Sequence, residues 1–140
     1  MTGLERHHHS FRLPLAVLDR LRRHAAGRQA SQTALVQRYI AEGIAMDLYP
    51  LVVFRDGPLG RRAMLEGSRL DVIQVVETVQ NEGGSVDAAA GYLSLTPVQV
   101  RACLRYYADH AEELAAYAEG VAEENERHRA AWEREQALLG

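Results

Sequence analysis

The sequence predicts a mainly α-helical protein with short β-strands. Apolar residues recur every three or four positions in each part of the chain, which is the period of an amphipathic helix. Alternation with a period of two, and short apolar runs bounded by turn residues, occur around residues 8–13 and 51–70, so strands are expected there. We therefore expect an N-terminal strand–helix–helix domain (1–47), a small helical middle domain (48–109) and a long C-terminal helix (110–140).

The composition is that of an ordinary globular protein, with 47% hydrophobic and 25% charged residues in a chain of 140. No apolar run approaches the ~20 residues that cross a bilayer, and the N-terminus lacks the pattern of a secretory signal. One cysteine cannot form an internal disulfide framework, which is typical of a reducing compartment. We expect a cytoplasmic protein with no membrane partner.

Charge is distributed unevenly along the chain. Residues 1–47 carry seven Arg against four acidic residues, 48–109 carry six against seven, and 110–140 carry three against eight. The corresponding net charges are +3, -1 and -5, and every basic residue is arginine rather than lysine. Arginine suits planar recognition of phosphate and guanine, so the basic N-terminal part prompts a nucleic-acid hypothesis.

The first expected element is a strand before Pro14. Polar residues alternate there with less polar ones: His8, Ser10 and Arg12 against His9, Phe11 and Leu13. Such alternation predicts a half-buried strand with Ser10 and Arg12 facing outward. A helix is expected from Leu15 to a stop at Gly27, and a second helix begins after Ser31 or Thr33, both of which are plausible N-caps.

A strand and two short helices bury too little apolar surface alone, and a single strand leaves both of its edges unpaired. Two copies solve both problems, because the strands pair antiparallel and four helices close a shared core. We therefore expect an intertwined homodimer whose paired ribbon presents Ser10 and Arg12 twice, in a shape that fits a DNA major groove.

The first 47 residues resemble the ribbon-helix-helix superfamily of repressors and antitoxins. The resemblance covers about residues 7–47 and lies in the Arg12-Leu13-Pro14 step and the turn Gly27-Arg28-Gln29-Ala30-Ser31. It implies base reading by alternate strand residues and phosphate contacts at the start of the second helix. The implied DNA-binding residues are His8, Ser10, Arg12, Arg28, Ser31 and Thr33.

Each of these residues also has a simpler interpretation. Arg12 is a solvated surface arginine if no DNA binds, and Ser31 and Thr33 cap a helix with or without DNA. Alternate histidines on a strand point to opposite faces, so the run at 7–9 is a poor chelator and we predict no metal site.

In the middle segment, residues 51–54 predict a short strand, residues 63–70 a second strand and turn, and the valines after Asp71 a helix that ends at Gly83-Gly84. Ser85 and Thr96 are expected N-caps of two further helices. The second of these is expected to face inward with Val100, Cys103, Leu104 and Tyr107. A short helix, a turn and a longer helix have the outline of a helix-turn-helix.

This middle segment resembles a small antitoxin-associated domain of unknown function that occurs in VapB-type antitoxins. The resemblance spans about residues 50–115 and lies in four separate motifs: Gly67-Ser68-Arg69-Leu70-Asp71-Val72, the following Gly-rich loop, Leu95-Thr96-Pro97-Val98-Gln99-Val100-Arg101 and Leu104-Arg105-Tyr106-Tyr107-Ala108. It implies a winged-helix-like module and no enzyme. Arg69 is a local hydrogen-bonding anchor or a phosphate contact, and Arg101 and Arg105 face DNA, a partner or solvent.

From His110 the chain has no proline and is rich in helix formers. A weak apolar stripe runs along this expected helix, through Leu114, Ala118, Val121, Asn125, His128 and Trp132. Leu114, Val121 and Trp132 are the candidate partner-binding residues. The partner is the dimer mate, the middle domain or, as the antitoxin resemblance implies, a toxin protein. Otherwise the helix is solvated, or it self-associates and drives a higher assembly of dimers on DNA.

The leading hypothesis is a homodimeric transcription regulator that binds double-stranded DNA and represses its own promoter. The alternative is an antitoxin that neutralises a toxin nuclease through its C-terminal part. The sequence shows no phosphate loop, metal-ligand cluster or acid–base pair with convincing spacing, so we expect neither an enzyme nor a cofactor. Cys103 shares a face with Val100 and is expected to be a buried thiol.

Overall fold

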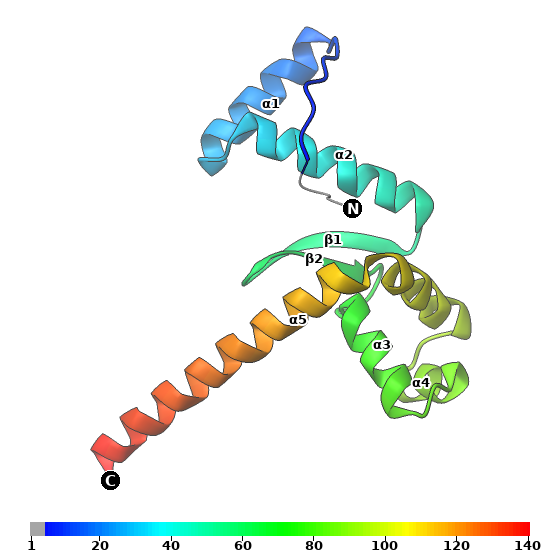
Figure 1. The fold of residues 1–140 in the computed structure, drawn as a ribbon, viewed down its shortest axis with the longest axis vertical. Helices are drawn as coiled ribbons and strands as arrows, with labels where there is room; N and C mark the ends of the chain where they lie inside the picture. The colour runs from blue at the N-terminus through cyan, green and yellow to red at the C-terminus, as the bar shows by residue number, and fades with distance from the viewer. Residues whose placement is uncertain (1–4) are drawn as a thin grey trace. The chain divides into compact units, whose positions relative to one another are not determined.

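The computed structural model describes residues 5–140 and is mainly helical, with one small antiparallel sheet (Figure 1). The chain divides into two compact units: unit 1 ends at Ala41, and unit 2 covers Glu42–Gly140. In chain order the elements are α1 (Leu15–Arg28), α2 (Gln32–Leu48), β1 (Val52–Gly57), β2 (Gly60–Leu65), α3 (Val72–Asn81), α4 (Val86–Leu93) and α5 (Pro97–Leu139). The boundary between the two units falls within α2.

In unit 1, α1 begins directly after Pro14, whose carbonyl accepts the amides of Val17 and Leu18 at 3.0 and 3.1 Å. The helix was expected to stop at Gly27, and that expectation is wrong. It continues to Arg28, and the chain turns at Gln29, which has a left-handed φ of 53°. The next amide, from Ala30, closes the turn by donating to the Ala25 carbonyl at 2.9 Å.

The start of α2 decides between the two expected caps. The Ser31 hydroxyl accepts the Ala34 amide at 3.3 Å, so Ser31 is the N-cap. Thr33 lies in the first turn of the helix and is exposed.

Residues 5–14 contain neither helix nor strand, so the strand expected at 8–13 is absent from the single chain. The physical reason is that a strand needs a neighbour to satisfy its backbone groups. The sheet of the described chain holds only β1 and β2.

In unit 2 the two expected strands are present as β1 and β2, and they pair as an antiparallel hairpin with Val52 opposite Leu65 and Gly57 opposite Gly60. The second strand, expected with its turn at 63–70, covers Gly60–Leu65. Gly67 has a φ of 76° and allows the tight turn that follows β2. Ser68 supplies the hydrogen bonds of this turn, donating to the Leu65 carbonyl at 2.8 Å and accepting the Leu70 amide at 3.1 Å. Arg69 was expected as the local anchor; its side chain is exposed, and the anchor is Ser68.

Helices α3, α4 and α5 form the core of unit 2 together with the hairpin. Ser85 and Thr96 cap α4 and α5 as predicted, through hydrogen bonds to Ala88 and Gln99. The predicted face of α3 is confirmed, because its four valines are between 0% and 6% exposed. On α5 the buried aromatic residue is Tyr106, whereas Tyr107 was expected to face inward and is half-buried.

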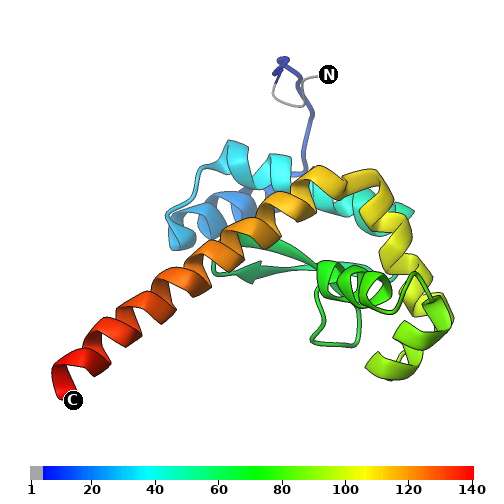
Figure 2. The same cartoon turned by 60° about the horizontal axis from the view of Figure 1, so that its bottom comes forward.

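Helix α5 runs from the middle segment into the C-terminal segment with a kink at His110, whose φ of -133° and ψ of 27° are not helical (Figure 2). Beyond the bend, Leu114 joins the core of unit 2. Gly57 and Gly120 mark places where the hairpin tip and α5 approach closely, beside Tyr117 and Leu59 respectively. The first part of the expected C-terminal helix (110–140) therefore packs on the middle segment.

Within residues 5–140, no helix is long and apolar enough to cross a membrane.

Candidate functional site

Unit 1 carries most of its apolar side chains on an uncovered surface. Of its described residues, only Ala25 and Leu35 are buried hydrophobic residues. Between the extended segment and the two helices lies an open cavity of about 680 Å³. Its lining is mostly apolar and consists of Phe11, Leu13, Val17, Leu21, Val36, Tyr39 and Ile40, with Arg12, Arg20 and His24 at its margin.

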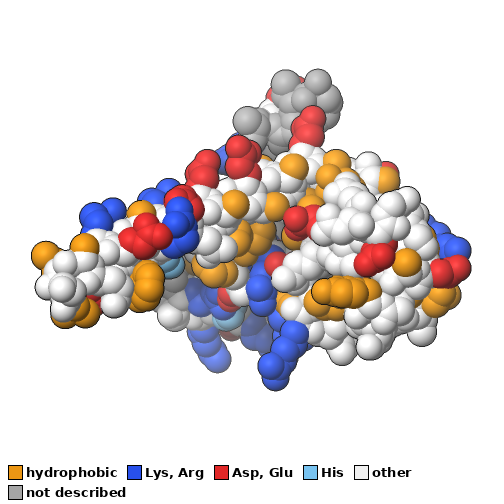
Figure 3. Space-filling model, turned by 90° about the horizontal axis from the view of Figure 1, so that it is seen from below, with side chains coloured by type: hydrophobic (Ala, Val, Ile, Leu, Met, Phe, Trp, Pro, Cys, Tyr) orange, Lys and Arg blue, Asp and Glu red, His pale blue; other side chains and the backbone are white. Residues whose placement is uncertain are grey.

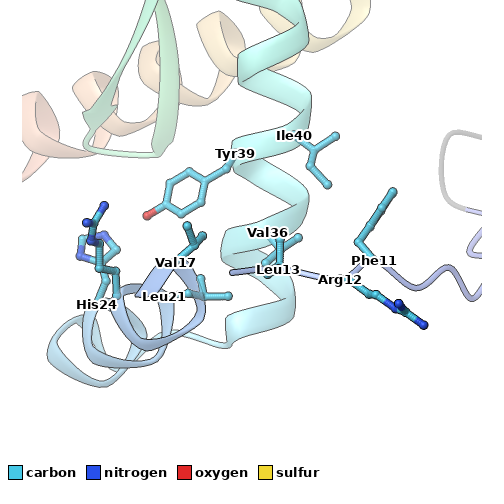
Figure 4. A pocket seen from close by; sticks show the side chains of 10 residues that line it. Phe11, Arg12, Leu13, Val17, Leu21, His24, Val36, Tyr39 and Ile40 are labelled. Carbon is cyan, nitrogen blue, oxygen red and sulfur yellow. The ribbon is translucent and has the colours of Figure 1, made fainter. Parts of the chain in front are cut away.

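Figure 4 shows Leu13, Val17, Leu21 and Val36 gathered between α1 and α2, with their side chains directed toward one another. The surrounding side chains are exposed to solvent: Phe11 is 70% exposed and Ile40 is 47% exposed. A contiguous apolar patch of this kind marks an interaction surface, because water contact with it is unfavourable.

The apolar stripe continues along α2. Val36, Ile40, Ile44 and Leu48 follow one another at intervals of four residues, and the last two are 56% and 65% exposed. Residues four apart lie on the same side of a helix, so these side chains form one strip.

The extended segment places alternate residues on alternate sides. The Ser10 hydroxyl lies 3.2 Å from Nε2 of His8, two residues away, and the rings of His9 and Phe11 lie 4.5 Å apart. Phe11 and Leu13 face the cavity, whereas the Arg12 guanidinium points away from its apolar centre (Figure 4). The contacts between residues two apart, His8 with Ser10 and His9 with Phe11, have the two-residue period of a strand.

The other three candidates of unit 1 lie at the turn between its helices. Arg28 is in the last turn of α1, Ser31 caps α2 and Thr33 is in its first turn; all three are exposed. The amides at the start of α2 also lie here, and backbone N–H groups at a helix start suit anions. All three residues therefore lie within the same short turn region, between the end of α1 and the first turn of α2.

In unit 2, Arg101 and Arg105 flank a groove of about 340 Å³. Its other walls are Tyr49, Pro50 and Leu51, which follow α2, and Val98 and Ala102 of α5. Both arginines are exposed, and neither is in an ion pair within the described chain. Arg69 is also exposed but does not line this groove.

One wall of the groove is held in place by an aromatic cluster. The Tyr49 hydroxyl donates a hydrogen bond to Asp109, which raises the pKa of Tyr49. The Tyr49 ring packs edge-on against Tyr106 and His110, at 5.1 and 5.6 Å, and the latter two rings stack at 4.2 Å. Burial raises the pKa of Tyr106 to about 12, so its hydroxyl stays neutral at physiological pH.

Two polar contacts of unit 2 escaped the sequence analysis. Tyr49 and Asp109 are 60 positions apart. Arg61 donates to both carboxylate oxygens of Glu42, at 2.7 and 2.9 Å, and to the Phe54 carbonyl at 3.2 Å. Residues so far apart in the sequence share no local pattern, so these pairs become visible only in the three-dimensional structure.

The candidate partner-binding residues of the C-terminal segment differ in their exposure to solvent. Leu114 is 8% exposed and belongs to the core, so it is not available to a partner in this conformation. Val121 is half-buried, and Trp132 is 59% exposed. Cys103 is fully buried as expected, and burial raises the pKa of its thiol to about 11.

Beyond Val121, α5 carries charged side chains that pair within the helix. Arg129 binds Glu126 and Glu133, and Arg127 binds Glu124. Figure 3 shows acidic, basic and hydrophobic side chains interleaved along this projecting arm. Pairs three or four residues apart support an exposed helix, but each contributes little because solvent screens the charges.

Among the residues described, no group of three or more His, Cys, Asp or Glu side chains is placed to hold a metal ion. No protein-family model, curated protein or solved structure matches the chain.

Proposed function

We propose that this protein is a sequence-specific DNA-binding transcription regulator of the ribbon-helix-helix kind, active as a homodimer. The observation that carries the proposal is the two-sided extended segment before α1. Phe11 and Leu13 line an apolar cavity, the Ser10 hydroxyl lies 3.2 Å from the His8 ring, and the Arg12 guanidinium points away from the apolar centre of the cavity (Figure 4).

The uncovered apolar surface of unit 1 supports a second copy as the missing partner. A twofold dimer pairs the extended segments antiparallel and covers the cavity and the α2 strip with identical surfaces. In such a ribbon, the backbone N–H and C=O groups of alternate residues of the extended segment would pair with those of the second copy.

The polar side supports DNA as the ligand. A two-stranded ribbon fits the major groove, and Arg12 from each copy has the fork of donors that recognises guanine. Residues 1–47 carry a net charge of +3 while the whole chain carries -3, so the basic charge is concentrated where the ribbon lies. In this proposal the start of α2, with Ser31 and Thr33, contacts phosphates together with Arg28.

A titration with the DNA upstream of the coding sequence tests the proposal, using wild type and Arg12→Ala at two salt concentrations. We expect salt-sensitive binding that prefers this DNA over random DNA, and a loss of about 1–3 kcal/mol of discrimination per lost base contact in the variant. Arg23→Ala is the matched control, because it removes an exposed arginine of α1 outside the ribbon and leaves Arg12 in place. Equal affinity for both DNAs in wild type would overturn the proposal.

A second candidate function is toxin neutralisation, and the exposure of Trp132 favours it. The arm of α5 beyond Val121 presents this aromatic side chain without covering it, as expected for a helix that binds another protein. Co-expression with the product of a neighbouring gene, followed by co-purification with wild type and Trp132→Ala, tests this candidate. A stable complex that the variant loses would support it, and no complex with wild type would dismiss it.

A further inference from the structure

The groove between Tyr49 and α5, defined above by its lining, combines an apolar floor with unpaired positive charge. Pro50, Leu51 and Val98 provide apolar surface, and Arg101 and Arg105 stand beside it without an ion pair in the described chain. The phosphates of double-stranded DNA would match the arginines but leave the apolar surface uncovered, because the base faces stay stacked inside the duplex. A protein segment with an apolar anchor next to a carboxylate matches both features.

The chain itself contains such a segment near its C-terminal end. Trp132 is 59% exposed, and Glu135 lies one turn further along the same side of α5. Unlike Glu124, Glu126 and Glu133, Glu135 forms no ion pair within the described residues. The arm therefore offers an uncovered indole with an uncompensated carboxylate beside it.

A copy of the chain cannot place its own Trp132 in its own groove. Arg101 and Trp132 belong to the same helix, and a rise of ~1.5 Å per residue separates them by roughly 46 Å along its course. Figures 1 and 2 show the start of α5 and its C-terminal end at opposite ends of unit 2. Any such contact must join two copies.

We infer that the groove of unit 2 binds the C-terminal arm of a second copy, with Trp132 on the apolar floor and Glu135 facing Arg101 and Arg105. The inference rests on charge and shape complementarity within unit 2 and does not depend on DNA binding. The contact joins two different surfaces, so it is heterologous and propagates from copy to copy unless it closes into a ring. If unit 1 also dimerises on DNA, the contact links neighbouring dimers and makes binding to repeated sites cooperative.

Trp132 is the sole tryptophan and reports on its own position. We expect the fluorescence emission of the full-length protein to shift to shorter wavelength as its concentration rises, because the indole leaves water. Arg101→Glu combined with Arg105→Glu should raise the concentration of half-maximal shift by about tenfold or more, and added salt should act in the same direction. The matched control is Arg55→Glu combined with Arg69→Glu, which makes the same change of charge at exposed positions of unit 2 outside the groove; it should leave the shift unchanged.

A mixing experiment separates this contact from pairing of two arms. Copies with Arg101→Glu and Arg105→Glu retain the tryptophan but have a defective groove, while Trp132→Ala copies retain the groove and have no tryptophan. The emission of the mixture should shift although neither variant shifts alone.

An emission typical of exposed indole at every concentration would overturn the inference. So would a shift that the groove variant shares with wild type, because Trp132 would then be buried elsewhere. The inference and the proposed function fail separately: Arg12→Ala is expected to abolish selective DNA binding and to leave the fluorescence shift intact.

Discussion

Units 1 and 2 both contain many apolar side chains, but unit 2 buries them and the described part of unit 1 leaves most of them exposed. In unit 2 the hairpin and three helices cover one another, and Leu65, Val75 and Val100 are completely buried. In unit 1, by contrast, Phe11, Val17 and Ile40 are between 42% and 70% exposed. The difference shows that unit 2 contains its own core, whereas the described part of unit 1 leaves most of its apolar side chains exposed. The proposed homodimer would bury these side chains against a second copy.

The largest expected effect comes from placing a charge on the uncovered surface of unit 1. Ile40→Asp should weaken self-association of the protein by about a hundredfold or more, because the dimer would have to bury an unpaired carboxylate. Sedimentation equilibrium of the full-length protein measures this. Gln37→Asp, at an exposed position of α2 outside the cavity lining, is the control and should behave as wild type. An unchanged association constant for Ile40→Asp would remove this surface from the interface.

The opposite behaviour is expected in the core of unit 2. Leu65→Ala should lower the free energy of unfolding by about 2–5 kcal/mol through lost burial and the resulting cavity, without affecting self-association through unit 1. Chemical denaturation with helix content as the signal checks the first part. Leu138→Ala, at a position that is 88% exposed, should change stability by less than about 0.5 kcal/mol. Similar losses for the two variants would show that Leu65 is not buried.

A smaller effect concerns pH. Burial raises the pKa of Cys103 from its ordinary value of 9.0 to about 11, so the unfolded thiol ionises before the folded one. The stability contributed by the neutral thiol is complete below pH 9 and is lost as pH rises to about 11, by up to about 1 kcal/mol per pH unit.

Chemical denaturation of wild type and Cys103→Ala between pH 9 and 11 tests whether stability falls with rising pH because of this thiol. Tyr106, whose pKa burial also raises, contributes a slope of the same sign above pH 10 to both proteins. Because the tyrosine slope is common to both proteins, the part removed by Cys103→Ala should be largest near pH 10, midway between the two pKa values of the thiol. Equal slopes in the two proteins there would contradict the assigned role of Cys103.

The sequence predicted the helices, the hairpin and most caps because these depend on local chemistry. Ser85, Thr96 and Gly67 act within a few residues of their own positions. The turn at Gln29 was missed because glycine is the usual left-handed residue and Gly27 stood nearby. Burial of Tyr106 rather than Tyr107 depends on neighbours distant in sequence, including Tyr49 and Phe54.

The candidate site was predictable only in part for the same reason. The alternation of residues 8–13 and the exposed positions of Arg101 and Arg105 are properties of one segment each. Leu114 was expected to contact a partner because it begins the weak apolar stripe of the C-terminal helix. Only the packing of α5 in unit 2 shows that it belongs to the core. The groove beside Arg101 combines two segments about 50 positions apart, so no local pattern could predict it.

Hydrogen exchange of the backbone amides of residues 9–13 tests most directly whether a second copy completes unit 1. These amides form no backbone hydrogen bonds within the described chain, whereas antiparallel pairing of two copies would engage them in alternation. At high protein concentration we predict that some of them exchange at least about a hundredfold more slowly than an unstructured peptide, and that dilution removes this protection while that of β1 persists. Unprotected exchange at every concentration would contradict a paired ribbon.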